Sequence, residues 1–217
     1  MTTVLVFDIE TIPDVAGLRR LEDFPASMLD ADVAQQVMQL RLDKTGSDFL
    51  PLYLQRIVAI SCVIRRTTKE GLPQIKVGSL GNPEDSEKVL IQAFFDLIEK
   101  YTPQLVSWNG SGFDLPVLHY RALINQVHAP RYWEMGESQD SDSREFKWNN
   151  YISRYHMRHL DLMDLLAKFN GRANAPLDAL AKLCGFPGKL GMDGSQVWPA
   201  YQAGKIADIR PNCETDD

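Results

Sequence analysis

The feature that most constrains the fold of this chain is a nearly continuous apolar run at residues 57–64. β-Branched residues dominate the run, and it lacks the polar alternation expected of a strand with one face in water. Such a run indicates a strand that is covered on both faces, and therefore a layered domain in which helices flank a sheet. Shorter apolar runs at residues 3–7 and 104–108 predict two further strands, and residues 74–80 predict a neighbour of the first.

Helical patterns occupy much of the rest of the chain. Apolar spacing, together with start signals such as Asn82 followed by Pro83, predicts several helices. They are expected at residues 29–42, 82–101, 113–126, 176–184 and 195–203. The polar segment 134–150 is expected to be an exposed loop. The mixed order of these elements predicts one α/β domain with a partly antiparallel sheet.

Composition narrows the class of protein. The 217 residues include 29 acidic and 23 basic side chains, which gives a formal charge of −6, and 44% are hydrophobic. This balance argues against a wholly disordered chain and against a generic nucleic-acid coat protein, which would use a basic surface. No run approaches the roughly 18 apolar residues that span a bilayer, and the first residues lack the basic region of a signal peptide. We therefore expect a cytoplasmic protein without a membrane segment.

The three cysteines give no support to a cross-linked or zinc-held fold. Cys62, Cys184 and Cys213 form no close pair and no CxxC motif. Cys62 and Cys184 are expected to be small core residues.

Acidic side chains follow two of the predicted strands. Asp8 and Glu10 come directly after the first strand, and the period of two places both carboxylates on the same side of the chain. Asp114 follows another strand and begins a predicted helix, where the helix dipole favours its ionised form. Asp216 stands near the end of the sequence. Converging carboxylates favour hard cations such as Mg²⁺ or Mn²⁺, and two such ions support phosphoryl transfer to water.

These acids lie in motifs that resemble those of a known superfamily. Residues 6–11 (Val-Phe-Asp-Ile-Glu-Thr) resemble the first motif of the DEDD 3′–5′ exonucleases, and residues 107–116 (Ser-Trp-Asn-Gly-Ser-Gly-Phe-Asp-Leu-Pro) resemble the second. The long interval between the second and the last acid is similar to that in the proofreading domains of family-B DNA polymerases. Residues 159–166 and 176–181 resemble the helical elements that precede the third motif. The chain is therefore similar, over its whole length, to the stand-alone bacterial exonucleases of the polymerase-B-like branch.

The resemblance implies a fold, an activity and a set of ligands. It implies a ribonuclease-H-like mixed sheet flanked by helices, with residues 1–217 forming a single exonuclease domain. The implied reaction removes nucleotides from the 3′ end of single-stranded nucleic acid, DNA rather than RNA, with two Mg²⁺ or Mn²⁺ ions as cofactors. Asp8 would bridge both ions, and Glu10 would ligate one and contact the terminal nucleotide or the attacking water. Asp114 and Asp216 would complete the ligand shells.

The third motif departs from the family pattern. The polymerase-B-like branch has Tyr-x-x-x-Asp, whose tyrosine hydroxyl helps to position the attacking water, whereas this chain has Asn212 at the tyrosine position. The chain also stops at Asp217, where the family continues with a helix, so Asp216 is expected on a terminus that frays. We therefore expect a domain that lacks its C-terminal helix, is weakly active or inactive, and binds ions mainly through Asp8 and Asp114.

Three alternatives stay open. His159 and Asp164 have the His-x-x-x-x-Asp spacing of the histidine-bearing DEDD branch, in which the imidazole acts as general base. A nucleic-acid-binding module that keeps the fold but has lost catalysis is the second, and Asn212 favours it. A metal-dependent phosphatase that acts on free nucleotides is the third and weakest.

Residues expected to contact nucleic acid fall into two groups, because aromatic rings stack on unpaired bases and cations follow phosphates. The first group flanks the acids: Ile9, Thr11, Trp108, Asn109 and Phe113. The second interleaves rings with cations: Trp148, Tyr151, Arg154 and Arg158. Packing inside the protein is the alternative explanation for both groups.

Overall fold

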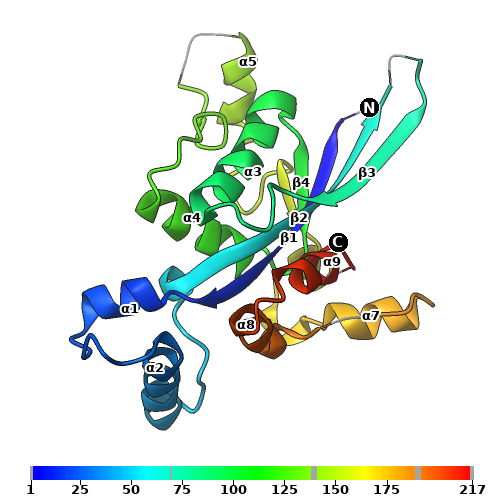
Figure 1. The fold of residues 1–217 in the computed structure, drawn as a ribbon. Helices are drawn as coiled ribbons and strands as arrows, with labels where there is room; N and C mark the ends of the chain where they lie inside the picture. Colours follow the sequence, from blue (N-terminus) through cyan, green and yellow to red (C-terminus); the bar gives the residue numbers. More distant parts are fainter. Residues whose placement is uncertain (1, 69, 138–140, 189–191, 216–217) are drawn as a thin grey trace.

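Five strands form one mixed sheet in the order β3-β2-β1-β4-β5 (Figure 1). The computed structural model describes residues 2–68, 70–137, 141–188 and 192–215. The strands are β1 (Val4–Pro13), β2 (Gln55–Thr67), β3 (Pro73–Ser79), β4 (Gln104–Ser107) and β5 (His159–Asp161). β1 runs antiparallel to β2 and parallel to β4, and β4 runs parallel to β5. The expected ribonuclease-H-like mixed sheet with flanking helices is confirmed.

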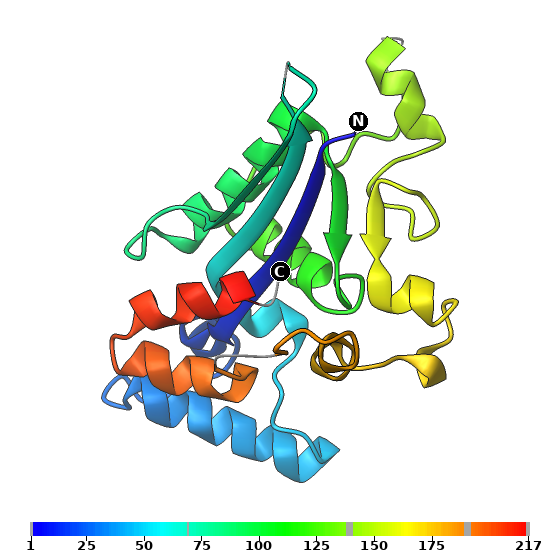
Figure 2. The ribbon, with the colours of Figure 1, turned by 90° about the vertical axis from the view of Figure 1, so that its right-hand side faces the viewer.

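Helices cover both faces of this sheet. α3 and α4 pack on one face, and α8 and α9 lie across the other, over β1 and β2 (Figures 1 and 2). The helices are α1 (Val15–Leu21), α2 (Asp30–Thr45), α3 (Glu87–Tyr101), α4 (Asp114–Ile124), α5 (Ser141–Arg144), α6 (Leu162–Leu166), α7 (Leu177–Leu183), α8 (Gly194–Gln202) and α9 (Ile206–Thr215). Short 3₁₀ turns occupy Leu52–Leu54, Glu145–Lys147 and Gly171–Ala173.

The alternation of side chains along β1 divides its residues between the two faces. Leu5, Phe7 and Ile9 point toward α3 and α4 and belong to the main apolar core. Ile12 belongs to a second apolar cluster, which β1 and β2 share with α8 and α9. Since Asp8 and Glu10 have the same parity as Ile12, the period of two sends both acids to the α8/α9 face.

The N-terminal helices form an arm beside the sheet. α1 and α2 close over a third apolar cluster that includes Leu18 and Val33. In Figure 2, α2 lies alongside α8. Trp198 of α8 packs against both the second and the third cluster, so it joins the arm to the layer that covers β1.

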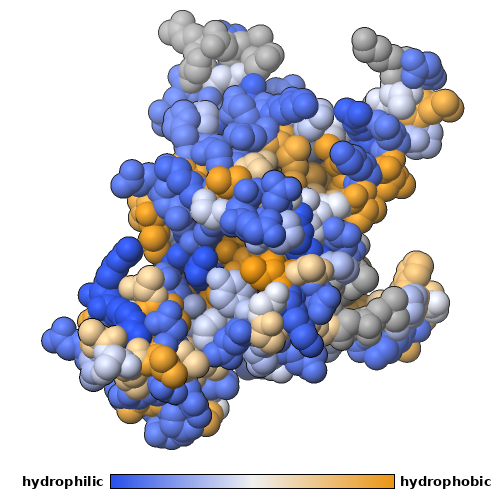
Figure 3. Space-filling model, in the orientation of Figure 1, coloured by the Kyte–Doolittle hydropathy of each residue, from blue (hydrophilic) through white to orange (hydrophobic). Residues whose placement is uncertain are grey.

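Two elements extend from the layers. The hairpin of β2 and β3 carries the exposed apolar side chains Leu72, Ile75 and Val77, and Figure 3 shows apolar atoms among the hydrophilic surface there. α7 buries none of its residues, and Cys184, which follows it, is exposed. The expectation that Cys184 is a core residue is therefore wrong, whereas Cys62 is buried as expected. Among the described residues no helix combines the length and the apolar character needed to cross a bilayer.

Several expected boundaries differ from the structure. The helix expected from Asn82 begins at Glu87, because the Asp85 carboxylate accepts from the Asn82 backbone N–H and closes a turn before it. The segment expected to be an exposed loop contains α5 and a 3₁₀ turn with the buried Phe146. His159–Asp161, interpreted as part of a helical element, is the edge strand β5.

Candidate metal centre

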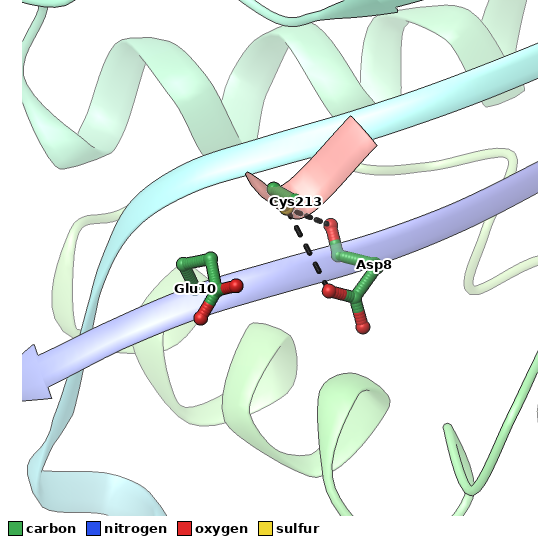
Figure 4. Close-up of side chains that lie close together, drawn as sticks. All are labelled: Asp8, Glu10 and Cys213. Atoms are coloured by element: carbon green, nitrogen blue, oxygen red, sulfur yellow. Dashed lines mark hydrogen bonds between the residues drawn. The ribbon is translucent and has the colours of Figure 1, made fainter. Parts of the chain in front are cut away.

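A group of metal-ligating side chains lies where α9 crosses β1. One ligand atom each from Asp8, Glu10 and Cys213 lies within 4.8 Å of the others. Figure 4 shows the two carboxylates on β1 with the thiol of α9 beside them. Cys213 Sγ is 3.4 Å from the Asp8 backbone oxygen and 3.7 Å from Asp8 Oδ2. The arrangement therefore joins residues that are 205 positions apart.

Polar contacts hold α9 in this position. Ser61 Oγ of β2 donates to the Cys213 backbone oxygen at 2.8 Å. Ser79 of β3 donates to Glu214 Oε1 from both its backbone nitrogen and its hydroxyl, at 2.8 and 2.7 Å. Arg210 donates to the backbone oxygen of Gly81 at 2.7 Å. The helix is thereby fixed to two strands and to the turn that follows them.

Asp114 reaches the same strand from the opposite layer. The pairing of β1 with β4 runs to Val6, and further along β1 the Asp114 carboxylate accepts a hydrogen bond from the backbone N–H of Ile9. Burial raises the pKa of Asp114 to about 7, and the charges of Asp161 and Glu10 add to the rise, against the lowering effect of backbone hydrogen bonds. Its Oδ1 atom is buried and has no hydrogen-bond partner among the described residues.

The turn before Asp114 is held by a further carboxylate, that of Asp161. Asp161 accepts from the backbone nitrogens of Asn109 and Ser111, both at 2.9 Å. Asn109 has a left-handed backbone conformation, with φ 62°. At position 110 only glycine fits, because a Cβ atom there would lie 2.1 Å from Ser107 Oγ. This tight turn after β4 sets where α4 begins.

His159 and Asp164, the alternative candidates for the third motif, make other contacts. His159 Nε2 lies 2.7 Å from Ser107 Oγ, and burial lowers the pKa of this imidazole to about 4. Asp164 accepts two hydrogen bonds from the guanidinium of Arg154, at 2.8 and 2.6 Å. His159 Nε2 and both carboxylate oxygens of Asp164 are thus engaged within the protein.

A buried arginine ties the elements that carry the acids. Arg121 of α4 donates to Glu87 of α3 at 2.6 and 2.7 Å, and to Asp14, directly after β1, at 2.5 Å. All three side chains are more than nine-tenths buried. Because this triad fixes α4 against the end of β1, it also fixes Asp114 against Ile9.

A cavity of about 800 Å³ opens beside Glu10. Its lining comes from β1, from α2 and the segment after it, from the start of β2, from the turn before α4, and from α8. Phe49 and Phe113 face each other at its mouth, with ring centroids 5.9 Å apart. Trp198 lines the cavity from α8.

The first group of expected nucleic-acid contacts lies around this site. Ile9, Thr11, Asn109 and Phe113 line the cavity. Trp108 is half-buried in the turn beside them.

The second group is placed differently from expectation. Tyr151 is in the main core and its hydroxyl donates to the Pro103 backbone oxygen, so its ring is not available to a base. Arg158 lies over the rings of Phe146 and Tyr151, and Arg154 pairs with Asp164, whereas Trp148 is exposed. The guanidinium of Arg158 thus packs against rings of the protein itself. The attraction is the same as between a cation and the face of a bound aromatic group.

The third motif is only partly described. Asn212 belongs to α9, and Asp216 lies outside the described residues. Motif analysis missed Cys213 as a member of the centre. The available signal was its position three residues before Asp216, a spacing that places side chains on one face of a helix.

The side chains present fit a divalent cation. Carboxylates from Asp8 and Glu10 supply anionic oxygens, and the unpartnered buried oxygen of Asp114 is a further donor nearby. A cation bound between them would offset the cost of burying the charge of Asp114, whose pKa burial and then the charges of Asp161 and Glu10 raise.

A mixed sheet of this strand order, with Asp8 and Glu10 on its central strand β1 and Asp114 at the start of α4, places the chain in the ribonuclease-H-like class of proteins. The chain belongs to the family of predicted 3′–5′ exonucleases related to the exonuclease domain of PolB, whose model matches residues 47–217. No curated protein matches the chain.

Solved structures of Escherichia coli Exonuclease I are among those similar to this chain. The complex with a dA16 oligonucleotide is 13% identical with a TM-score of 0.40, over 99% of this chain and 42% of that one. The zinc-bound complex with single-stranded DNA is 14% identical with a TM-score of 0.39, over 99% of this chain and 42% of that one. The chain thus spans less than half the length of these structures.

Proposed function

We propose that this protein is a 3′–5′ exonuclease that hydrolyses single-stranded nucleic acid, DNA rather than RNA, from its 3′ end. Membership of a family of predicted exonucleases supports the reaction class. The observation that carries the proposal is that Glu10 lies beside Asp8 on β1 and its charge acts on the buried Asp114 of α4, next to a cavity that opens at Glu10.

Two divalent cations, Mg²⁺ or Mn²⁺, are part of the proposal. When bound, they supply activation of the attacking water and stabilisation of the leaving oxygen. Asp8 and Glu10 would hold them from β1 and Asp114 from α4, with Asp216, which lies outside the described residues, as the fourth acid. The unpartnered Asp114 oxygen supports this assignment, because it gains a partner when a cation binds.

The cavity is the proposed place of the terminal nucleotide. Ile9 lies on its wall next to the acids, and Phe113 and Phe49 offer ring faces at its mouth. Asn109 and Thr11 add polar atoms that can orient the sugar or the base. The chain's own residues would thus hold the 3′ end in place while Asp8 and Glu10 lie at the scissile phosphate.

We further propose that Asn212 reduces turnover. An amide hydrogen-bonds water but lacks the reach and the acidity of the tyrosine hydroxyl found in the related branch. Asn212→Tyr should therefore raise the hydrolysis rate. His159→Ala and Asp216→Ala, tested separately, assign the third motif: we expect Asp216→Ala to abolish hydrolysis and His159→Ala to preserve most of it.

One assay tests the proposal. A 5′-labelled single strand is incubated with the protein in Mg²⁺ or Mn²⁺ and resolved by length. We expect a ladder of products shortened from the 3′ end, and no ladder for Asp8→Asn or Asp114→Asn. Retention of the strand without cleavage would instead identify a binding module, and phosphate release from mononucleotides alone would identify a phosphatase.

A further inference from the structure

The thiol of Cys213 is the unexpected member of the centre. It is fully buried, and it lies closer to the Asp8 backbone oxygen and carboxylate than a chance neighbour in an apolar core would. Its Sγ atom and one oxygen each of Asp8 and Glu10 lie within 4.8 Å of one another, which is close enough for one cation to contact all three.

We propose that Cys213 is a sulfur ligand to the divalent cation held by Asp8 and Glu10, so that this centre prefers thiophilic cations such as Zn²⁺, Co²⁺ and Cd²⁺ over Mg²⁺. The proposal rests on the metal site of the proposed function. The new element is the choice of cation. Thiolates select soft and borderline metals, whereas carboxylates alone suit Mg²⁺ and Mn²⁺.

The backbone around Cys213 is positioned for this role. Ser61 Oγ holds the Cys213 carbonyl, and Glu214, the next residue, is anchored to Ser79, so the backbone that carries the thiol is fixed beside β1. An independent observation supports a ligand site in this region: the Oδ1 atom of Asp114, whose carboxylate accepts from Ile9 between Asp8 and Glu10 on β1, is buried and lacks a hydrogen-bond partner among the described residues.

Coordination by sulfur requires the Cys213 thiol to lose its proton. The cation forms a bond with sulfur, and the S–H proton leaves to solvent, so binding releases one proton more than it does at an oxygen-only site. The sulfur gives up its hydrogen bond to Asp8 at the same time. Electrons are not transferred in this step.

Cobalt spectroscopy tests the proposal without any substrate. Co²⁺ alone is titrated into the metal-free protein, and sulfur-to-cobalt charge-transfer absorption is followed in the near ultraviolet. We expect a saturable band in the natural protein and in the matched controls Cys184→Ser, at the exposed thiol, and Cys62→Ser, at the other buried one. Cys213→Ser and Asp8→Asn should lack it.

Competition titrations then measure selectivity. Cys213→Ser should bind Cd²⁺ at least about tenfold more weakly, the lower end of what even an outer-shell metal partner contributes. Its Mg²⁺ affinity should stay within about twofold of the natural protein, since Mg²⁺ gains little from sulfur. Cys213→Ala serves as the second variant, and circular dichroism confirms that each variant is folded.

The outcomes separate this proposal from the nuclease proposal. A band that persists in Cys213→Ser, or equal losses of Cd²⁺ and Mg²⁺ affinity, overturns the sulfur ligand even if the protein degrades DNA. A band that needs Cys213 and Asp8, in a protein that cleaves nothing, supports the sulfur ligand while the nuclease proposal fails.

Discussion

Asp114 is the side chain whose charge depends most strongly on its surroundings. It is buried, acidic neighbours face it, and one of its oxygens lacks a partner among the described residues. Its pKa is raised from 3.8 to about 7, so the folded protein retains a proton that the unfolded chain releases between those two values. The free energy of unfolding therefore decreases as pH rises through this interval, and the loss is complete above pH 7.

Asp114→Asn should remove this pH dependence. In EDTA the variant should be more stable than the natural protein by on the order of 2–4 kcal/mol above pH 7, with the difference shrinking toward pH 4. Added Mn²⁺ should stabilise the natural protein much more than the variant. Urea unfolding followed by circular dichroism across this range is the measurement, with Asp96→Asn on the exposed side of α3 as control. A stability difference that does not change with pH would contradict the assignment.

At the scale of elements, the Arg121 triad decides how α4 stands against β1. Arg121→Met should lower the free energy of unfolding by about 3–5 kcal/mol, because it leaves the buried Glu87 and Asp14 carboxylates unpaired. Lys182→Met is the control, since the Lys182–Asp178 pair on α7 lies at the surface, with side chains 59% and 39% exposed, and should contribute less than about 1 kcal/mol. Urea unfolding at neutral pH compares the two. Equal effects of the two substitutions would show that the triad is not what fixes α4.

The attachment of α9 to β3 leads to a second prediction at this scale. Glu214→Ala removes the acceptor for two Ser79 donors and should lower the stability of the α9 contact by about 1–3 kcal/mol. Amide hydrogen exchange should therefore accelerate in α9 and leave α3 unchanged, and Mn²⁺ should bind more weakly. Glu84→Ala, at an exposed position, is the control. Unchanged exchange in α9 would mean that other contacts hold the helix.

Sequence patterns predicted some elements and missed others for identifiable reasons. The apolar run at 57–64 predicted β2 because both faces of this strand are covered. β5 was missed because three residues are too few for periodicity to show, and the residues after it are helical. α9 was missed because Pro211 interrupts it and its buried residues, Ile209 and Cys213, are few.

The candidate site was predictable where chemistry dictates the residue type. Asp8 and Glu10 lie within β1, and Asp114 begins α4, where its carboxylate accepts from the backbone N–H of Ile9 in β1. The roles assigned to these acids stay a prediction. The packing of Tyr151 in the core and of Arg158 over its ring was not predictable, because an aromatic and a cation look alike in sequence whether they face a base or each other. Separating these cases requires burial, which only the packed molecule defines.

At the scale of the whole molecule, the cavity beside Glu10 combines segments that are far apart in the sequence, from β1 to α8. Phe49 is half-exposed at its mouth and is set there by the segment that follows α2. If the terminal base stacks on this ring, Phe49→Ala should weaken binding of a single-stranded oligonucleotide by about 1–3 kcal/mol, the usual contribution of one base–aromatic stack.

Fluorescence anisotropy in Ca²⁺ measures this affinity, and a 3′-terminal 2-aminopurine reports stacking directly. Leu123→Ala, an exposed apolar side chain on α4, is the matched control. A Phe49→Ala variant that binds like the control and still quenches the terminal base would place the nucleotide elsewhere.

The contact between Asp8 and Cys213 also has a consequence for how the protein is made. Pairings so distant along the polypeptide close the longest loops and form late, after local helices and hairpins. A nascent chain on the ribosome therefore exposes β1 without its covering helix until the residues of α9 have emerged. The donor atoms gather last, so the protein acquires its proposed chemistry only when synthesis has passed residue 213.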